Sequence, residues 1–129
     1  MNEDATPVTA IVVDDEKLNR EVMTAHLSAA GCDVVGTAAD GPEAVQLFRE
    51  ARPDFVLLDI NMPGLNGIDV LRAIKEDEPS AYVVMMTAVD GAGALEDCMI
   101  AGARDYIRKG IPADQIAPRI KRHIDRLRK

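Results

Sequence analysis

Six polar side chains that suit metal and phosphate chemistry follow short apolar runs of the sequence. They are Asp14, Asp15, Asp59, Asn61, Thr87 and Lys109. If these runs are parallel strands, their carboxyl ends meet along one edge of the sheet, where open α/β folds bind ligands. Three carboxylates gathered there repel one another, and protonation or a bound cation must relieve the repulsion. The spacing therefore predicts an acidic pocket built from distant parts of the chain.

The ligand atoms in this pocket are all oxygen, which indicates a hard cation. The two cysteines, Cys32 and Cys98, lie far apart and have no Cys or His nearby at metal-ligand spacing, so neither zinc nor a disulfide framework is supported. Oxygen ligands favour Mg²⁺ before Mn²⁺ or Ca²⁺. Since Mg²⁺ binds one or two carboxylates together with a phosphate oxygen, the acids can hold the metal while the metal holds a phosphoryl group.

Asp59 is the natural nucleophile of the set. A carboxylate can form an aspartyl phosphate when a metal and a lysine screen its negative charge from the incoming group, and Lys109 supplies that second positive charge. Thr87 supplies a hydroxyl donor that can sense a phosphoryl oxygen. Taken singly, Asp14 and Asp15 would be acids at a helix start, Thr87 a strand-end cap and Lys109 a solvated charge. Their convergence with Asp59 favours the functional interpretation.

Strands and helices must position these residues, and the sequence shows apolar patterns of strand length and of helix length in alternation. Such alternation is typical of βα units and a parallel sheet. The predicted strands are 10–13, 34–38, 55–58, 82–86 and 105–108. Five helical segments follow them. Pro63, Gly64 and Gly67 are interpreted as turn and helix-start residues with a positioning role.

Three of the helices carry detailed expectations. The first has one apolar face formed by Leu18, Val22, Ala25 and Ala29, and it ends at Gly31 in the left-handed conformation. The fourth places Leu95, Met99 and Cys98 on its apolar face and ends at Gly102. The fifth carries the stripe Ile116, Ile120, Ile124 and Leu127. Because Pro118 interrupts that pattern, the fifth helix should start late or bend.

The composition limits the classes of protein to which the chain can belong. With 129 residues, 47% hydrophobic and 29% charged, the chain fits one globular domain, interpreted as an extension over 1–8 and a domain over 9–129. No apolar run approaches the roughly 20 residues of a membrane span, and the acidic start lacks a secretory signal, so we expect a cytoplasmic protein. The net charge of −7 argues against nucleic-acid binding, although 119–129 is basic. His26 and His123 have no ligand partners and are predicted at the surface.

Four motifs in this order resemble those of bacterial response-regulator receiver domains. They are Val-Val-Asp-Asp-Glu at 12–16, Leu-Leu-Asp-Ile-Asn-Met-Pro-Gly at 57–64, Met-Thr-Ala at 86–88 and Asp-Tyr-Ile-Arg-Lys at 105–109. The resemblance runs from about Ala10 to the end of the chain. It implies a flavodoxin-like (βα)5 fold, in which a five-stranded parallel sheet of order 2-1-3-4-5 has helices on both faces.

The same resemblance implies a role for each site residue. Asp59 would accept a phosphoryl group from a phosphohistidine on a sensor histidine kinase or a phosphotransfer protein. Mg²⁺, with Mn²⁺ as the alternative, would bind Asp15, Asp59 and the main-chain carbonyl of Asn61, and Asp14 would support it through water. The domain would phosphorylate and dephosphorylate itself but would not otherwise be an enzyme.

A switch is also implied. Thr87 and Lys109 would hold the phosphoryl oxygens, and Tyr106 would turn inward as Thr87 moves. The face built by the fourth helix, fifth strand and fifth helix would then change its affinity for a downstream protein or an output domain, or support dimerisation. Membrane and direct nucleic-acid binding are not expected.

Two departures from the family pattern concern loops. Receivers usually follow the lysine of the fifth strand with proline, often through a cis bond, but here Gly110 follows Lys109, and we expect a rearranged turn. Glycines in 90–93 predict a mobile segment.

Three other functions are weighed against the receiver. A metal-dependent phosphatase of the haloacid-dehalogenase type also forms an aspartyl phosphate, but its nucleophile follows the first strand with an acid two residues later, whereas Asp59 has Asn61 there. A receiver-like scaffold that works without phosphorylation is disfavoured by the complete set of site residues. Nucleotide hydrolysis by a P-loop is unsupported because the chain has no Gly-x-x-x-x-Gly-Lys-Ser/Thr stretch.

Overall fold

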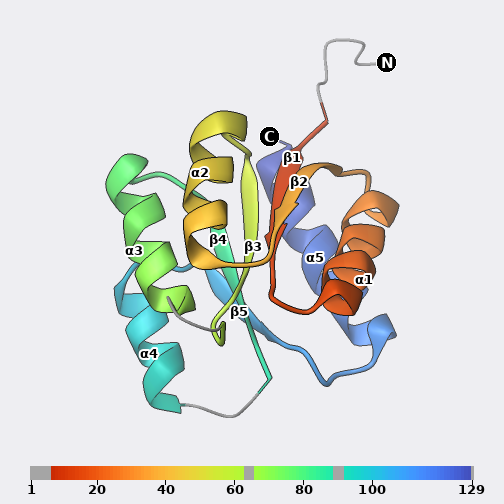
Figure 1. Cartoon of the computed structure of the whole chain (residues 1–129). Coiled ribbons are helices and arrows are strands. Elements are labelled where there is room, and N and C mark those ends of the chain that lie inside the picture. Colours follow the sequence, from red (N-terminus) through yellow and green to blue (C-terminus); the bar gives the residue numbers. More distant parts are fainter. Residues whose placement is uncertain (1–6, 63–65, 89–91, 129) are drawn as a thin grey trace.

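The protein is a five-stranded parallel sheet covered by helices on both faces (Figure 1). The computed structural model describes residues 7–62, 66–88 and 92–128. The strands are β1 (Thr9–Val13), β2 (Asp33–Ala38), β3 (Phe55–Asp59), β4 (Val83–Thr87) and β5 (Asp105–Arg108). Their order is β2-β1-β3-β4-β5, which confirms the predicted fold class and strand order.

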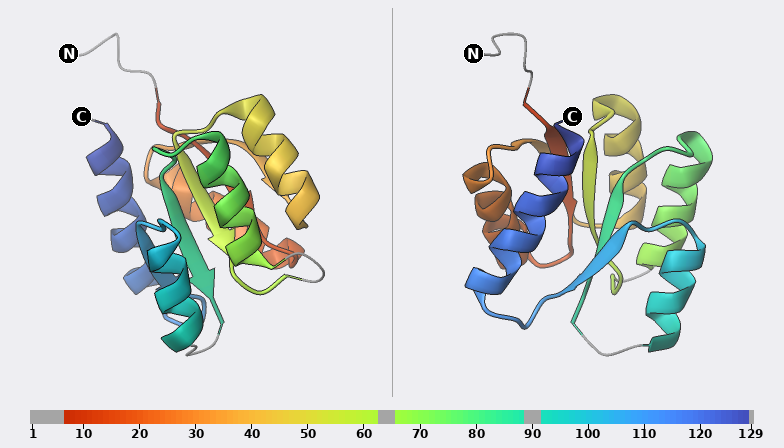
Figure 2. Two further views of the ribbon diagram at one scale, coloured as in Figure 1. Left: turned by 90° about the vertical axis from the view of Figure 1, so that its left-hand side faces the viewer. Right: turned by 180° about the vertical axis from the view of Figure 1, so that it is seen from behind.

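Helices follow the strands in strict alternation. They are α1 (Lys17–Ala29), α2 (Gly41–Ala51), α3 (Gly67–Asp77), α4 (Ala92–Ile100) and α5 (Ala113–Leu127). Figure 2 shows α1 and α5 on one face of the sheet and α2, α3 and α4 on the other. Because apolar side chains cover both faces, the central strands β3 and β4 are buried at every position. Among the described helices, none is both long and apolar enough to cross a lipid bilayer.

The strand order reverses at β1, which pairs with β2 on one side and β3 on the other. Val13 is in register with Ala38 of β2 and with Leu58 of β3. The chain leaving β1 stays close to the sheet, since the Asp14 amide donates to the Ala38 carbonyl at 3.0 Å. Residues that follow β1 and β3 therefore meet at the same edge.

The predicted apolar face of α1 is wrong. All four of its residues are exposed, with Leu18 at 71% and Val22 at 40%, whereas Met23 and Leu27 are buried against the sheet. The helix carries two apolar stripes of helical period, and the period alone does not decide which one packs. Tertiary packing selects the stripe with the longer side chains.

Replacing Leu27 with Ala is expected to lower the free energy of unfolding by about 2–5 kcal/mol, because the change leaves a cavity at a fully buried position. Leu18→Ala, on the same helix, is the matched control and should change stability little, since the side chain is already in water. Urea denaturation of both variants measures the difference. Equal losses would contradict the observed orientation of α1.

The helix ends follow the sequence expectations. Gly31 adopts the predicted positive φ, at +86°, after the end of α1, and Gly102, predicted only to end α4, also has a positive φ of +109°. The cysteines are buried fillers, and burial raises the pKa of Cys32 to about 11. On α4, Cys98 packs into the core as expected, but Met99 is 45% exposed.

The last helix does not start late, and one of its residues lies elsewhere than predicted. Its stripe of Ile116, Ile120 and Ile124 is buried as predicted, yet the helix begins at Ala113 and runs through Pro118. Proline removes one hydrogen bond there, but its ring is exposed, and burial of the isoleucine stripe outweighs the loss. His123, predicted at the surface, is only 4% exposed.

Loop expectations are tested in part. No cis peptide bond occurs within the described ranges, which include the bond between Lys109 and Gly110. The segment expected to be mobile lies largely outside the described residues, as do Pro63 and Gly64.

Candidate functional site

Three aspartates meet at the carboxyl edge of the sheet. Asp14 and Asp15 directly follow β1, and Asp59 is the last residue of β3. One carboxylate oxygen from each lies within 4.8 Å of the others. Asp14 and Asp59 are fully buried, whereas Asp15 is exposed. The structure thus brings together the three acids that the sequence placed in one pocket, and the pocket opens to solvent on the Asp15 side.

The two buried aspartates are held in the same way. Asp14 Oδ1 accepts a hydrogen bond of 2.9 Å from the Glu16 amide, and Asp59 Oδ1 accepts one of 3.1 Å from the Asn61 amide. Each carboxylate therefore forms a short turn, in which it accepts a hydrogen bond from the main-chain amide two residues later. The second oxygen of each turns toward Lys109.

Lys109 stands between these two carboxylates. Its Nζ lies 2.9 Å from Asp14 Oδ2 and 3.0 Å from Asp59 Oδ2, and the side chain is 12% exposed. These contacts are ion pairs, and neither Oδ2 atom has a hydrogen-bond partner among the residues that the structure describes. The Lys109 amide donates to the Thr87 carbonyl at 2.8 Å, which fixes the end of β5 against the end of β4.

Burial and charge shift the titration of the site. Burial raises the pKa of Asp59 to about 6; contact with Lys109 opposes the rise, and the charge of Asp14 adds to it. Burial alone would lower the pKa of Lys109, but its close contacts and charge interactions with the carboxylates of Asp14 and Asp59 outweigh that effect and raise it. At neutral pH one lysine therefore faces an excess of negative charge.

This excess fits a divalent cation. The acids offer only oxygen ligands, and two of the buried oxygens lack a directed hydrogen bond. Oxygen donors and net negative charge suit Mg²⁺. The site residues present therefore fit the metal that the sequence predicts.

Thr87 and Tyr106 occupy the neighbouring strands. Thr87 ends β4, is 3% exposed and is in register with Arg108; Met86, just before it, pairs with Asp59. Tyr106 is half-buried on β5 and packs against the core beneath α2, α3 and α4. Both lie on strands next to the pocket, and their switching roles stay predictions.

Gly67 matters more than its predicted helix-start role indicates. A Cβ at this position would overlap the Asp59 carbonyl oxygen and lie 2.6 Å from Ile60 Cα. Its amide donates to the Ile60 carbonyl at 2.8 Å, and Asn66 caps the same helix by accepting from the Asp69 amide. The start of α3 thus lies directly against the main chain of Asp59, a contact that local sequence signals do not reveal.

Gly67→Ala is expected to lower the free energy of unfolding by about 1–3 kcal/mol and to displace the backbone at Asp59, because the methyl group meets main-chain atoms that cannot rotate away. Gly110→Ala is the matched control, since nothing lies within 4 Å of a Cβ there. Thermal unfolding and backbone amide shifts at Asp59 report both effects. A tolerated Gly67→Ala would contradict the close approach.

Arg20 is a further residue that the sequence does not indicate. Its Nη1 donates to the Asp14 carbonyl at 2.8 Å, so α1 braces the loop that carries the buried aspartate. Glu16 also faces the pocket, with Oε1 3.9 Å from Lys109 Nζ. A hydrogen bond from a guanidinium to a main-chain carbonyl six residues earlier has no recognisable sequence pattern.

Comparison with known proteins decides the family. The family model of the response regulator receiver domain matches residues 10–121. The chain belongs to the response-regulator receiver family. Receiver domains are signalling domains that bind Mg²⁺ at an acidic pocket and interact with histidine kinases or phosphotransfer proteins and with output domains.

Relatives include stand-alone receivers and larger regulators. The chemotaxis protein CheY of Thermotoga maritima is 35% identical over 99 residues, which are 77% of this chain and 82% of that protein. The probable transcriptional regulatory protein TcrX of Mycobacterium tuberculosis is 34% identical over 118 residues, so this receiver spans about half of that relative.

Solved structures agree with the fold. The crystal structure of the CheX–CheY–BeF3–Mg complex from Borrelia burgdorferi contains a chain with a TM-score of 0.87 and 30% identity, covering 95% of this receiver and 93% of that chain. The response regulator domain of Thermotoga maritima CheB has a TM-score of 0.84 at 33% identity, with 95% and 96% covered.

Proposed function

We propose that Asp59 accepts a phosphoryl group from a phosphohistidine on a sensor histidine kinase or phosphotransfer protein in a Mg²⁺-dependent reaction. The observation that carries this proposal is the placement of a buried Asp59 carboxylate within one acid cluster and 3.0 Å from Lys109. A nucleophile, a cation and metal-binding oxygens are then all within one pocket. No other described cluster of potential metal ligands has this form.

The chemistry is a displacement at phosphorus. A carboxylate oxygen of Asp59 forms a bond to phosphorus while the bond from phosphorus to the donor nitrogen breaks, and the histidine leaves with the electron pair. Asp14, Asp15, Asp59 and the Asn61 carbonyl would hold the metal, with Asp14 acting through water. When bound, Mg²⁺ would supply positive charge to the transferring phosphoryl oxygens. Lys109 screens the nucleophile from the incoming negative charge.

The output is a shift between two conformations. Thr87 and Lys109 hold phosphoryl oxygens, and Tyr106 turns inward in response. Main-chain bonding between Lys109 and Thr87 supports this step, because it makes the ends of β4 and β5 respond together. Phosphoryl contacts must favour one state by a few kcal/mol for the face formed by α4, β5 and α5 to change its affinity for a partner.

The proposal also covers the extent of the domain, its location in the cell and its partners. The receiver unit is 9–129, it works in the cytoplasm where phosphohistidine donors are made from ATP, and it does not itself bind membranes or nucleic acid. Its partner is a downstream protein or an output domain, and the same α4–β5–α5 face can serve dimerisation. It turns over only its own phosphoryl group.

The test is incubation with acetyl phosphate and Mg²⁺ followed by intact mass and peptide mapping. We expect one hydroxylamine-sensitive phosphoryl group that is absent in Asp59→Ala and after removal of Mg²⁺ with chelator. Asp97→Asn, which changes an exposed acid on α4, is the control and should be labelled like wild type. Labelling that survives in Asp59→Ala, or steady turnover of an added phosphomonoester, would refute the proposal.

A further inference from the structure

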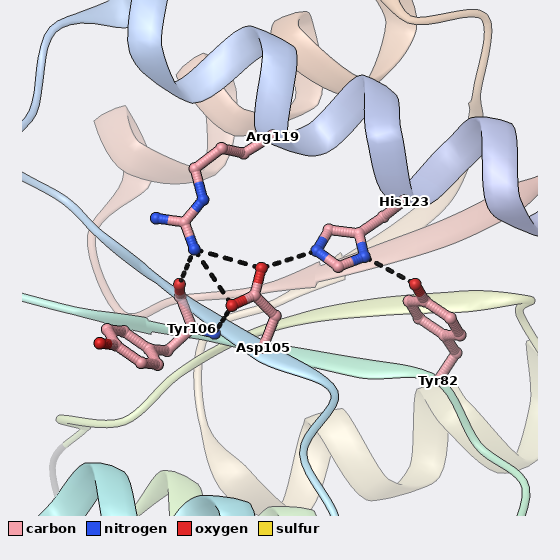
Figure 3. Close-up of polar contacts among 5 residues, drawn as sticks. All are labelled: Tyr82, Asp105, Tyr106, Arg119 and His123. Atoms are coloured by element: carbon pink, nitrogen blue, oxygen red, sulfur yellow. Dashed lines mark hydrogen bonds and ion pairs between the residues drawn. The ribbon is translucent and has the colours of Figure 1, made fainter.

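A second cluster of polar side chains lies on the face of the sheet covered by α5 (Figure 3). Its centre is His123, which the sequence placed at the surface and which is 4% exposed. His123 Nδ1 lies 2.6 Å from the Tyr82 hydroxyl, and Nε2 lies 2.8 Å from Asp105 Oδ2. Tyr82 immediately precedes β4 and Asp105 begins β5, so one imidazole joins α5 to both strands at this edge.

Arg119 extends the cluster to the main chain of Tyr106. Arg119 Nη2 lies 3.1 and 3.2 Å from the two oxygens of Asp105 and donates to the Tyr106 carbonyl at 2.6 Å. The Tyr106 amide donates to Asp105 Oδ1 at 2.8 Å. Both polar groups of the Tyr106 main chain are therefore bonded within this network, while its ring points away from His123 (Figure 3).

The charges in this network decide which of its atoms carry protons when His123 is neutral. Burial alone would raise the pKa of Asp105, but hydrogen bonds from His123, Tyr106 and Arg119 outweigh it and lower the pKa, so the carboxylate is ionised. Nε2 of a neutral His123 then donates to Asp105, and Nδ1 accepts from the Tyr82 hydroxyl. Every buried polar atom of the imidazole has a partner in this state.

Burial and three charged neighbours shift the titration of His123. Burial lowers the pKa of His123 below its ordinary value of 6.5; Asp105 on β5 opposes this, and Arg119 and Arg126 on α5 reinforce it. From the neighbouring elements, Phe55 presents an uncharged ring stacked at 6.1 Å. Arg104 holds its guanidinium over the Tyr82 ring at 4.6 Å.

Protonation of the second imidazole nitrogen of His123 changes the hydrogen bonds that the network can form. Nδ1 becomes a donor, so the Tyr82 hydroxyl must turn its hydrogen away from the imidazole. The imidazolium also competes with Arg119 for the single carboxylate of Asp105. Because Arg119 and Asp105 are the groups that hold the Tyr106 main chain, the competition acts directly on β5.

We propose that His123 is a positioning residue that transmits its protonation state through Asp105 and Arg119 to the main chain of Tyr106, and so makes the switch sensitive to pH. The first half of this inference stands on the network alone. The second half rests on the proposed function of Tyr106 as part of a phosphorylation switch.

The first experiment follows imidazole and amide resonances by NMR between pH 5 and pH 8. The chain has two histidines, so His26→Gln is the matched control for His123→Gln, whose amide can still donate to Asp105 but cannot titrate. We expect the Tyr106 amide to titrate with the midpoint of His123 in wild type and in His26→Gln, and to stay flat in His123→Gln. A Tyr106 midpoint that differs from that of His123, or that survives in His123→Gln, would overturn the inference.

Tyr82→Phe gives a second variant that keeps the imidazole. Removing the hydroxyl takes away the partner of Nδ1, and we expect the midpoints of His123 and Tyr106 to move together. Independent movement of the two midpoints would overturn the inference even if His123→Gln failed to fold.

The second experiment repeats the titration with beryllofluoride and Mg²⁺, which mimic a phosphoryl group on a carboxylate. Because coupling between sites is reciprocal, we expect the His123 midpoint to move by at least about 0.5 pH unit, about a threefold change in proton affinity, while His26 is unchanged. Resonances that respond at Asp59 without a change at His123 would overturn the coupling. If nothing responds to beryllofluoride, the proposed function fails, whereas the first experiment still decides the link to Tyr106.

Discussion

Lys109→Met is expected to lower the free energy of unfolding by about 3–5 kcal/mol at pH 7 without divalent ions. Removing one partner of a buried charge set leaves the others uncompensated, and here Asp14 and Asp59 would face each other with no cation between them. Denaturant unfolding measures the loss. The variant should also be phosphorylated by acetyl phosphate far more slowly than wild type, because the charge that screens Asp59 is gone.

Two further variants separate this effect from loss of packing. Lys109→Met combined with Asp59→Asn removes both charges and should recover a large part of the stability, which a double-mutant cycle quantifies. Lys121→Met breaks an exposed pair with Asp125 and should change stability little. A Lys109→Met loss that the second substitution leaves unchanged would show that the aliphatic stem, rather than the charge, supports the site.

Asp59→Asn is expected to raise the free energy of unfolding by about 3 kcal/mol at pH 7 without divalent ions. Burial raises the pKa of Asp59 from 3.8 in the unfolded chain to about 6, and each tenfold change in proton affinity corresponds to about 1.4 kcal/mol. The unfolded carboxyl loses its proton first, so wild-type stability falls as pH rises from about 4 through 6. The advantage of the amide should therefore be complete above pH 6 and vanish near pH 4.

The measurement is urea unfolding across that pH range, with Asp97→Asn as an exposed control. Saturating Mg²⁺ should stabilise wild type more than Asp59→Asn, because the amide removes one negative charge from the metal site. An advantage of Asp59→Asn that is the same at pH 4 and pH 7 would contradict the electrostatic origin of the destabilisation by Asp59.

The sequence predicts the sheet and the contents of the pocket because both follow from local patterns. Buried strands are short apolar runs, and the parallel topology forces the residues after β1 and β3 to one edge. Asp14, Asp15 and Asp59 could thus be grouped without coordinates. The order 2-1-3-4-5 came from family resemblance, and the observed pairing confirms it.

What the sequence misses depends on contacts between distant residues. His123 has no unusual neighbours along the chain, and its partners Asp105 and Tyr82 lie 18 and 41 residues away. The packing of α1 fails for a related reason, since Leu18 and Leu27 belong to competing stripes that only the sheet distinguishes. Gly67 shows a third limit, because its constraint is the main chain of Asp59 and not any neighbouring side chain.

If Asp59 accepts a phosphoryl group as proposed, the packing of α3 against β3 restricts the direction from which a donor can arrive. Gly67 lies against the main chain of Asp59 and Ile60, and Lys109 Nζ lies 3.0 Å from Asp59 Oδ2. Asp15 and Asn61, which follow the two buried aspartates in the chain, are exposed. Under the proposed function, we therefore expect donors as different as acetyl phosphate and a whole kinase domain to approach Asp59 past these two residues.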